Sequence, residues 1–132
     1  MLKIAYIGKV NQTNSVICDA IHASYSADIT FEEPSEVFSK PELLDDASLD
    51  FIIVDLNTAL GLGNAPDNIR KLYQHTPTSP LLVLHPYENN KLIEPLVESG
   101  AISVISTTPT EEKLKEAIDH ILDGRSFISY PE

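Results

Sequence analysis

The sequence predicts an α/β domain built on a parallel sheet with helices on both faces. Five short apolar segments recur along the 132 residues, at 2–7, 28–31, 50–55, 80–84 and 102–105. Three of them are continuously apolar rather than alternating, as expected of strands that are covered on both faces. Segments with helical period lie between them, and this alternation within one small domain is typical of a parallel sheet.

The intervening segments carry apolar residues at the three- and four-residue spacing of a helix. The predicted faces are Val16, Ile17, Ala20 and Ile21; Ile69, Leu72 and Tyr73; and Leu114, Ala117, Ile118, Ile121 and Leu122. Thr110 and the acids after it predict the start of the last helix, over 110–123.

Proline and glycine predict where the helices are short and where one ends. Pro34 and Pro41 leave room for only a short helix between the second and third strands. Pro95 is expected to shorten or kink a helix over 88–99, which Gly100 ends because glycine most easily adopts positive φ.

Length and composition predict one domain over residues 1–125, with 126–132 as a C-terminal tail or the start of a linker. No apolar run is long enough to span a bilayer, and the N-terminus lacks the layout of a signal peptide. The single cysteine, Cys18, fits a reducing compartment, so we expect a cytoplasmic protein without membrane contact. The formal net charge of −11 repels phosphate backbones and disfavours direct nucleic-acid binding.

Functional residues of such folds collect at the carboxyl ends of the strands. Asp55 ends the third predicted strand and is the candidate around which a site would form. Gly8 and Lys9 follow the first strand, His85 the fourth and Thr107 the fifth, so these four residues are expected at the same rim.

Other candidate motifs favour structural interpretations. His85 precedes a proline and is expected to be a solvated turn residue, since no other histidine has ligand spacing to it. The GLGN stretch at 61–64 has no strand feeding it directly and lacks the phosphate-loop pattern, so it is interpreted as a flexible connection.

The stretches DFIIVDLNTAL and ESGAISVISTTPTEEKLKEAIDHILDGRSFIS resemble response-regulator receiver domains, above all those of LuxR/NarL-class transcriptional regulators. The resemblance implies a flavodoxin-like (CheY-like) five-stranded sheet of order 2-1-3-4-5. It also assigns the position of the phospho-accepting aspartate to Asp55 and the position of the switch aromatic to Val104.

The chain departs from the receiver pattern at the remaining functional positions. Gly8 and Lys9 replace the acidic pair that holds Mg²⁺, His85 replaces the hydroxyl residue after strand four, and Thr107 replaces the lysine after strand five. Phosphoryl transfer to a carboxylate needs positive charge on the phosphoryl oxygens and a metal, so no cofactor is expected and Mg²⁺ binding is disfavoured. Lys9 either pairs with Asp55 in place of the metal or points into solvent.

Two functions from different classes follow. The first is a degenerate receiver (a pseudo-receiver) that acts through protein contacts without phosphorylation. Its expected partners are a DNA-binding domain, fused or separate, and a second copy bound through helix 88–99, strand 102–105 and helix 110–123. The alternative is an active receiver phosphorylated at Asp55 by a histidine kinase or a small phosphodonor. A flavin-binding enzyme is disfavoured because the chain lacks a phosphate-binding loop and aromatic residues placed to sandwich a flavin.

Overall fold

The computed structural model describes residues 1–8, 12–40, 49–56, 65–76, 79–85, 94–106 and 109–128. The strands are β1 (Leu2–Ile7), β2 (Ala27–Glu32), β3 (Phe51–Asp55), β4 (Leu81–His85), β5 (Ser103–Ser106) and β6 (Phe127–Ile128). The helices are α1 (Gln12–Ser24), α2 (Pro34–Ser39), α3 (Ala65–His75), α4 (Glu94–Glu98) and α5 (Glu111–Leu122).

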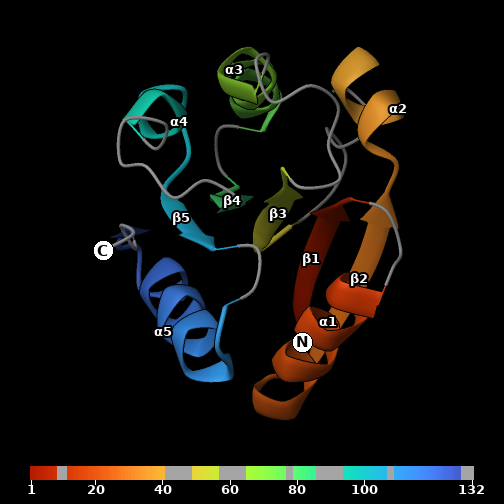
Figure 1. Cartoon of the computed structure of the whole chain (residues 1–132), viewed down its shortest axis with the longest axis vertical. Coiled ribbons are helices and arrows are strands. Elements are labelled where there is room, and N and C mark those ends of the chain that lie inside the picture. The colour runs from red at the N-terminus through yellow and green to blue at the C-terminus, as the bar shows by residue number, and fades with distance from the viewer. Residues whose placement is uncertain are drawn as a thin grey trace.

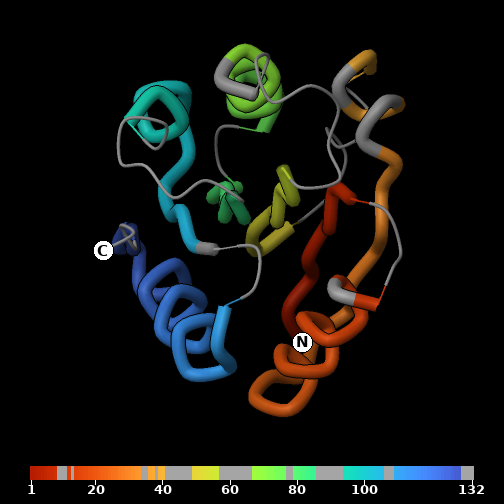
Figure 2. Tube along the Cα trace, in the orientation of Figure 1, coloured from red at the N-terminus to blue at the C-terminus, as the bar shows by residue number. Residues whose placement is uncertain are grey.

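All strand pairs are parallel, and the order across the sheet is β2-β1-β3-β4-β5-β6. The five predicted strands and their order are confirmed, and β1 lies between β2 and β3 as the trace in Figure 2 shows. The short strand β6 was not predicted. Its Phe127 backbone N–H donates to the Ser103 hydroxyl at 3.0 Å, and Phe127 and Ile128 pair with Ser103 and Val104.

Helices cover both faces of the sheet, as predicted. In Figure 1, α1 and α5 lie below the sheet and α2, α3 and α4 lie above it. Each face forms its own apolar layer, in which alternate strand residues meet the helices. Tyr6 and Ile53 belong to the layer between the sheet and helices α1 and α5. Val54 and Val83 belong to the layer between the sheet and the other three helices.

The helix ends follow the local sequence signals. Thr110 caps α5, with its hydroxyl accepting from the Lys113 backbone N–H at 3.1 Å, as predicted. Pro34 opens the short helix α2, and Pro95 lies in the first turn of α4, where a missing N–H is tolerated. No helix in the described part of the chain is both long and apolar enough to cross a bilayer.

The predicted helix faces were too wide at three positions. Val16 is 61% exposed, Tyr73 43% and Leu122 44%. Each is next in sequence to a buried apolar residue and lies at the edge of the helix face that packs on the sheet. A helix on a flat sheet buries only its central stripe, so the flanking residues remain in water.

The turn after α4 supports a stability prediction. Gly100 has a φ of +122°, and a Cβ there would lie 2.6 Å from Cγ of Tyr73 and 2.8 Å from its Cβ. Gly100→Ala therefore combines backbone strain with a steric clash. We expect it to lower the free energy of unfolding by about 3 kcal/mol in urea titrations.

Gly124→Ala is the matched control. Gly124 also has positive φ (+78°), but no heavy atom lies within 4 Å of the position that a Cβ would take. Backbone strain of about 1 to 2 kcal/mol is therefore the only expected cost. Equal losses in the two variants would show that the contact with Tyr73 is unimportant.

Candidate functional site

Asp55 closes β3 at the carboxyl edge of the sheet, as the sequence predicted, and only 3% of it is exposed. The chain beyond it stays attached to β4, because the Leu56 backbone N–H donates to the Leu84 carbonyl at 2.9 Å. A buried carboxylate loses its hydration and must be compensated by hydrogen bonds or by an opposite charge. This edge is therefore the candidate functional site.

Gly8 lies at the same edge, one residue beyond the end of β1, and it is buried. Its backbone N–H donates to the Glu32 carbonyl at 3.2 Å, which continues the pairing of β1 with β2. Since Ile7 is in register with Val54, the next residues, Gly8 and Asp55, stand at the same level of the sheet. The structure thus brings Gly8 and the candidate aspartate together.

Tyr6 is a residue of this site that the sequence analysis missed. It is in register with Ile53, and Asp55 lies two residues further on β3, so Tyr6 and Asp55 belong to the same face of neighbouring strands. The Tyr6 hydroxyl is buried and donates to Oδ1 of Asn14 in α1 at 2.6 Å. The ring packs against Phe31, with the ring centroids 4.8 Å apart.

The Tyr6 hydroxyl is influenced by its burial and by the charge of Asp55. Burial raises the pKa of the Tyr6 hydroxyl well above its ordinary value, and the negative charge of Asp55 raises this pKa further, followed by a contribution from Cys18. The hydroxyl therefore stays protonated at physiological pH. It is a permanent hydrogen-bond donor beside Asp55, and Asn14 is its acceptor.

The prediction that His85 is a solvated turn residue is wrong. His85 is the last residue of β4, is in register with Ser106, and is only 3% exposed. His85 is buried because β4 extends to this residue and pairs there with β5. Alternation along the strands assigns Asp55 to the face of α1 and α5, and His85 to the face of α3 and α4.

Val104 is fully buried in β5 and packs in the layer under α2, α3 and α4. Lys9 and Thr107 lie outside the described residues, as does the GLGN stretch, so the predicted pair of Lys9 with Asp55 stays a prediction. Within the described ranges, no three His, Cys, Asp or Glu side chains gather closely enough to hold a metal ion.

Comparison with known proteins identifies the kind of domain. No family model matches the chain. The transcriptional regulatory protein ComA of Bacillus subtilis (strain 168) is 31% identical over 108 residues, which cover 82% of this chain and 49% of ComA. This chain is a response-regulator receiver domain that resembles those of LuxR-class regulators. It spans about half the length of the curated relative that it matches.

Solved structures show the same fold. A LuxR family DNA-binding response regulator from Silicibacter pomeroyi has a TM-score of 0.76 at 19% identity, covering 98% of this chain and 97% of that one. The non-phosphorylated receiver domain of the stress response regulator RcsB from Escherichia coli has a TM-score of 0.80 at 13% identity, covering 97% and 98%. The receiver fold predicted from the sequence is therefore confirmed.

The contact between Tyr6 and Asn14 leads to a second stability prediction. Tyr6→Phe removes a buried donor but keeps the ring, so we expect the free energy of unfolding to fall by about 1 to 2 kcal/mol. Tyr73→Phe is the control, because that side chain is 43% exposed and should lose almost nothing. A double-mutant cycle with Asn14→Ala should give a clear coupling energy. Additive losses would contradict the prediction.

The thiol of Cys18 provides a prediction on pH dependence. Burial, with a smaller contribution from the charge of Asp19, raises the pKa of Cys18 to about 11. At pH 8 the folded chain should react with iodoacetamide about 100-fold more slowly than the urea-unfolded chain, whose thiol has an ordinary pKa of about 8.5 to 9.

The sign of the stability effect follows from the same shift. The folded chain holds the thiol proton more tightly than the unfolded chain. This contribution to stability is therefore complete below about pH 8.5 and is lost as the pH rises towards 11. Equal labelling rates in the folded and unfolded chains would contradict the raised pKa.

Proposed function

We propose that this receiver domain works without phosphorylation, as a protein–protein interaction module within a LuxR-class transcriptional regulator in the cytoplasm. One observation carries the proposal. At the edge where the phosphoryl chemistry of a receiver would take place, the position that follows β1, level with Asp55, belongs to Gly8, which has no side chain to bind a metal. Gly8 stands beside Asp55, Lys9 follows it, and Thr107 stands at the position of the family's lysine.

These replacements matter because of what the transfer of a phosphoryl group to Asp55 would require. An aspartyl phosphate forms when a metal and a lysine neutralise the charge that develops on the phosphoryl oxygens. Mg²⁺ is commonly held by one or two carboxylates together with waters and phosphate oxygens. Gly8 has no side chain to offer, and an ammonium group from Lys9 near Asp55 would compete with a metal for the carboxylate.

In the proposal, Lys9 pairs with Asp55 and holds the edge in one state. Asp55 is 3% exposed, and a carboxylate at that depth requires compensation. In the sequence Lys9 follows Gly8, and Gly8 is level with Asp55 in the sheet, which is what supports the proposed pair. The Tyr6 hydroxyl lies on the same face and already donates to Asn14.

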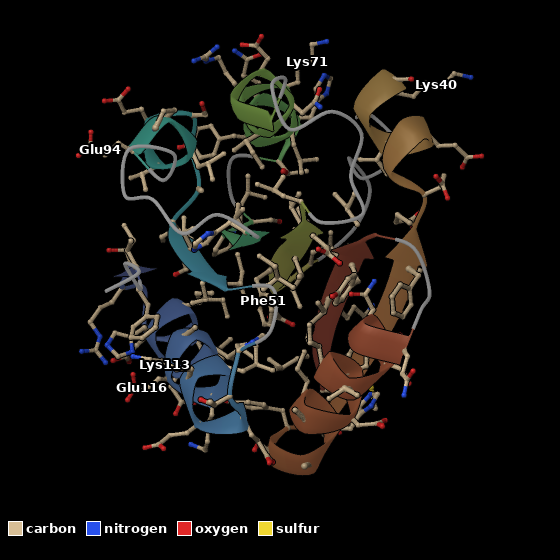
Figure 3. The ribbon with its side chains drawn as sticks, viewed as in Figure 1. Lys40, Phe51, Lys71, Glu94, Lys113 and Glu116 are labelled. Atoms are coloured by element: carbon tan, nitrogen blue, oxygen red, sulfur yellow. The ribbon has the colours of Figure 1, made fainter. Side chains whose placement is uncertain are left out.

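The proposed protein contact is the surface formed by α4, β5 and α5, with a second copy as its partner. Lys113 and Glu116 project from α5 on the side turned away from α1, as Figure 3 shows. Phe127 of β6 extends this surface, with the Lys113 ammonium 5.5 Å from its ring centroid and the His120 ring 5.1 Å away. The mixed charges of α5 suit a polar contact. A fused or separate DNA-binding domain would then carry the effect to a promoter.

The alternative is an active receiver, and the observation that favours it is Asp55 itself. It stands at the end of β3, in the position of a phospho-acceptor, on a fold shared with a regulator such as RcsB. In that case Asp55 would take a phosphoryl group from a histidine kinase or a small phosphodonor.

Intact-mass spectrometry after incubation with acetyl phosphate and Mg²⁺ distinguishes the two functions. We expect no gain of a phosphoryl mass, because the charge on the phosphoryl oxygens would not be neutralised. A phosphoryl adduct that is present in the natural chain and lost in Asp55→Ala would overturn the proposal and establish the alternative.

A variant with restored family residues serves as the positive control. Gly8→Asp, Lys9→Asp and Thr107→Lys together return the acidic pair and the lysine to the edge. If these residues are what the chain lacks, the triple variant should gain a phosphoryl mass that depends on Mg²⁺ and on Asp55. Circular dichroism should first show that the variant is folded.

A further inference from the structure

A hollow with a volume of about 350 Å³ lies between α1 and α5, which Figure 1 shows side by side below the sheet. Ile17 and Leu114, which belong to the buried apolar layer, form its floor, and Val16 and Ala20 flank it on α1. We name this hollow the α1–α5 groove. Pockets for small molecules have volumes of about 300 to 1,000 Å³, so the groove has room for a ligand at the small end of that range.

The groove is formed before any ligand binds, because the two helices are fixed relative to each other. Tyr25 follows the end of α1, and its hydroxyl donates to the Asp119 carboxylate of α5. The same hydroxyl lies 3.3 Å from the Lys115 carbonyl. A preformed site costs less conformational entropy to occupy than one that must be ordered on binding.

Each wall of the groove carries one exposed carboxylate. Asp19 belongs to α1 and Glu111 is the first residue of α5, and both line the groove. Among the residues that the structure describes, neither has an ion-pair partner. The lysines of α5 do not neutralise them, because Lys115 pairs with Asp119 at 2.9 Å and Lys113 projects from the far side of the helix (Figure 3).

Two carboxylates on opposite walls, with an apolar floor between them, define the chemistry of a fitting ligand. Such a ligand carries a cationic group at each end and an aliphatic chain in the middle. Packed helices lie about 8 to 10 Å apart from axis to axis, so the spacer needs about four to six methylene groups. An anion would be repelled by the walls and by the net charge of −11, and a compact metal ion would leave the apolar floor in water.

We propose that the α1–α5 groove is a binding site for a linear aliphatic polyamine. Its ammonium groups face Asp19 and Glu111, and its methylene groups lie over Ile17 and Leu114. Asp19 contributes more than Glu111, because the positive N-terminal end of the α5 dipole partly offsets the charge of a residue in its first turn. This site is separate from Asp55 and from the outer side of α5 used in the proposed function, so each can fail alone.

The test is a titration of the isotope-labelled natural chain with simple amines, followed in two-dimensional amide NMR spectra. Diaminobutane and diaminohexane should bind with a Kd on the order of 1 mM and move the signals of α1 and α5. Diaminoethane is too short to reach both walls, and butylamine has only one ammonium group. We expect both to bind at least tenfold more weakly, with about 10 as the ratio set by the loss of one ion pair and its chelate effect.

Matched variants locate the binding of diaminohexane. Asp19→Asn should weaken it about fivefold and Glu111→Gln about threefold at low salt, with smaller differences at high salt. Glu98→Gln and Glu116→Gln are the controls, since each removes one exposed acid outside the groove and should leave the Kd unchanged.

The apolar part of the site is tested separately. Val16→Ser should weaken the binding of diaminohexane about threefold, because it removes apolar surface beside the methylene chain. Leu122→Ser changes an exposed apolar residue outside the groove and should have no effect. All of these substitutions replace exposed residues, so circular dichroism should show folded chains.

Three outcomes would overturn the proposal. In the first, none of the diamines moves the signals of α1 and α5. In the second, butylamine and diaminoethane bind as well as diaminohexane, so that the spacing of the two ammonium groups is irrelevant. In the third, the groove variants and the control variants lose affinity equally, which would assign the binding to the overall negative charge of the chain rather than to the groove.

Discussion

The burial of β3 and β4 on both faces is the constraint on which the rest of the structure depends. Every residue from Phe51 to Asp55 and from Leu81 to His85 is buried, because helices cover the sheet above and below. Such strands have no solvent-facing side, so polar side chains are acceptable only at their ends. Asp55 and His85 are those ends, and both lie at the carboxyl edge of the sheet, where functional residues of such folds collect.

The buried charge at that edge is connected to the helices below the sheet. Asp55 shares its face with Tyr6, and the Tyr6 hydroxyl is bound to Asn14 in the first turns of α1. At its other end, α1 is joined to α5 through Tyr25 and Asp119, and both the Tyr25 hydroxyl and Lys115 hold the pKa of Asp119 below its usual value. The edge, α1 and α5 therefore belong to one connected layer.

Sequence reasoning predicted most of the fold because its signals are local. Short apolar runs marked the five strands, three of them continuously apolar, and Thr110 marked the start of α5. Tyr6 was missed because in the run LKIAYI it looks like any core residue, and its partner lies in the next helix. His85 was misjudged because proline follows it, while its burial depends on pairing with β5, a segment about 20 residues away in sequence. The two-residue strand β6 has no periodicity to detect and depends on Ser103.

The replacements at the carboxyl edge are compatible with an intact receiver fold because stability and phosphoryl chemistry depend on different residues. The stability of this fold comes mainly from the two apolar layers, whereas the replaced residues Gly8, Lys9, His85 and Thr107 come at the last residue of a strand or shortly after one in the sequence. A receiver fold is therefore no evidence of phosphoryl transfer. A phosphoryl group on Asp55 would replace the single negative charge of this buried carboxylate with the larger charge of about −1.5 to −2 on the phosphoryl oxygens. In a domain with a net charge of −11, the favourable change at any surface is the arrival of positive charge. The net charge of the domain therefore favours contact with cationic surfaces over contact with anionic ones.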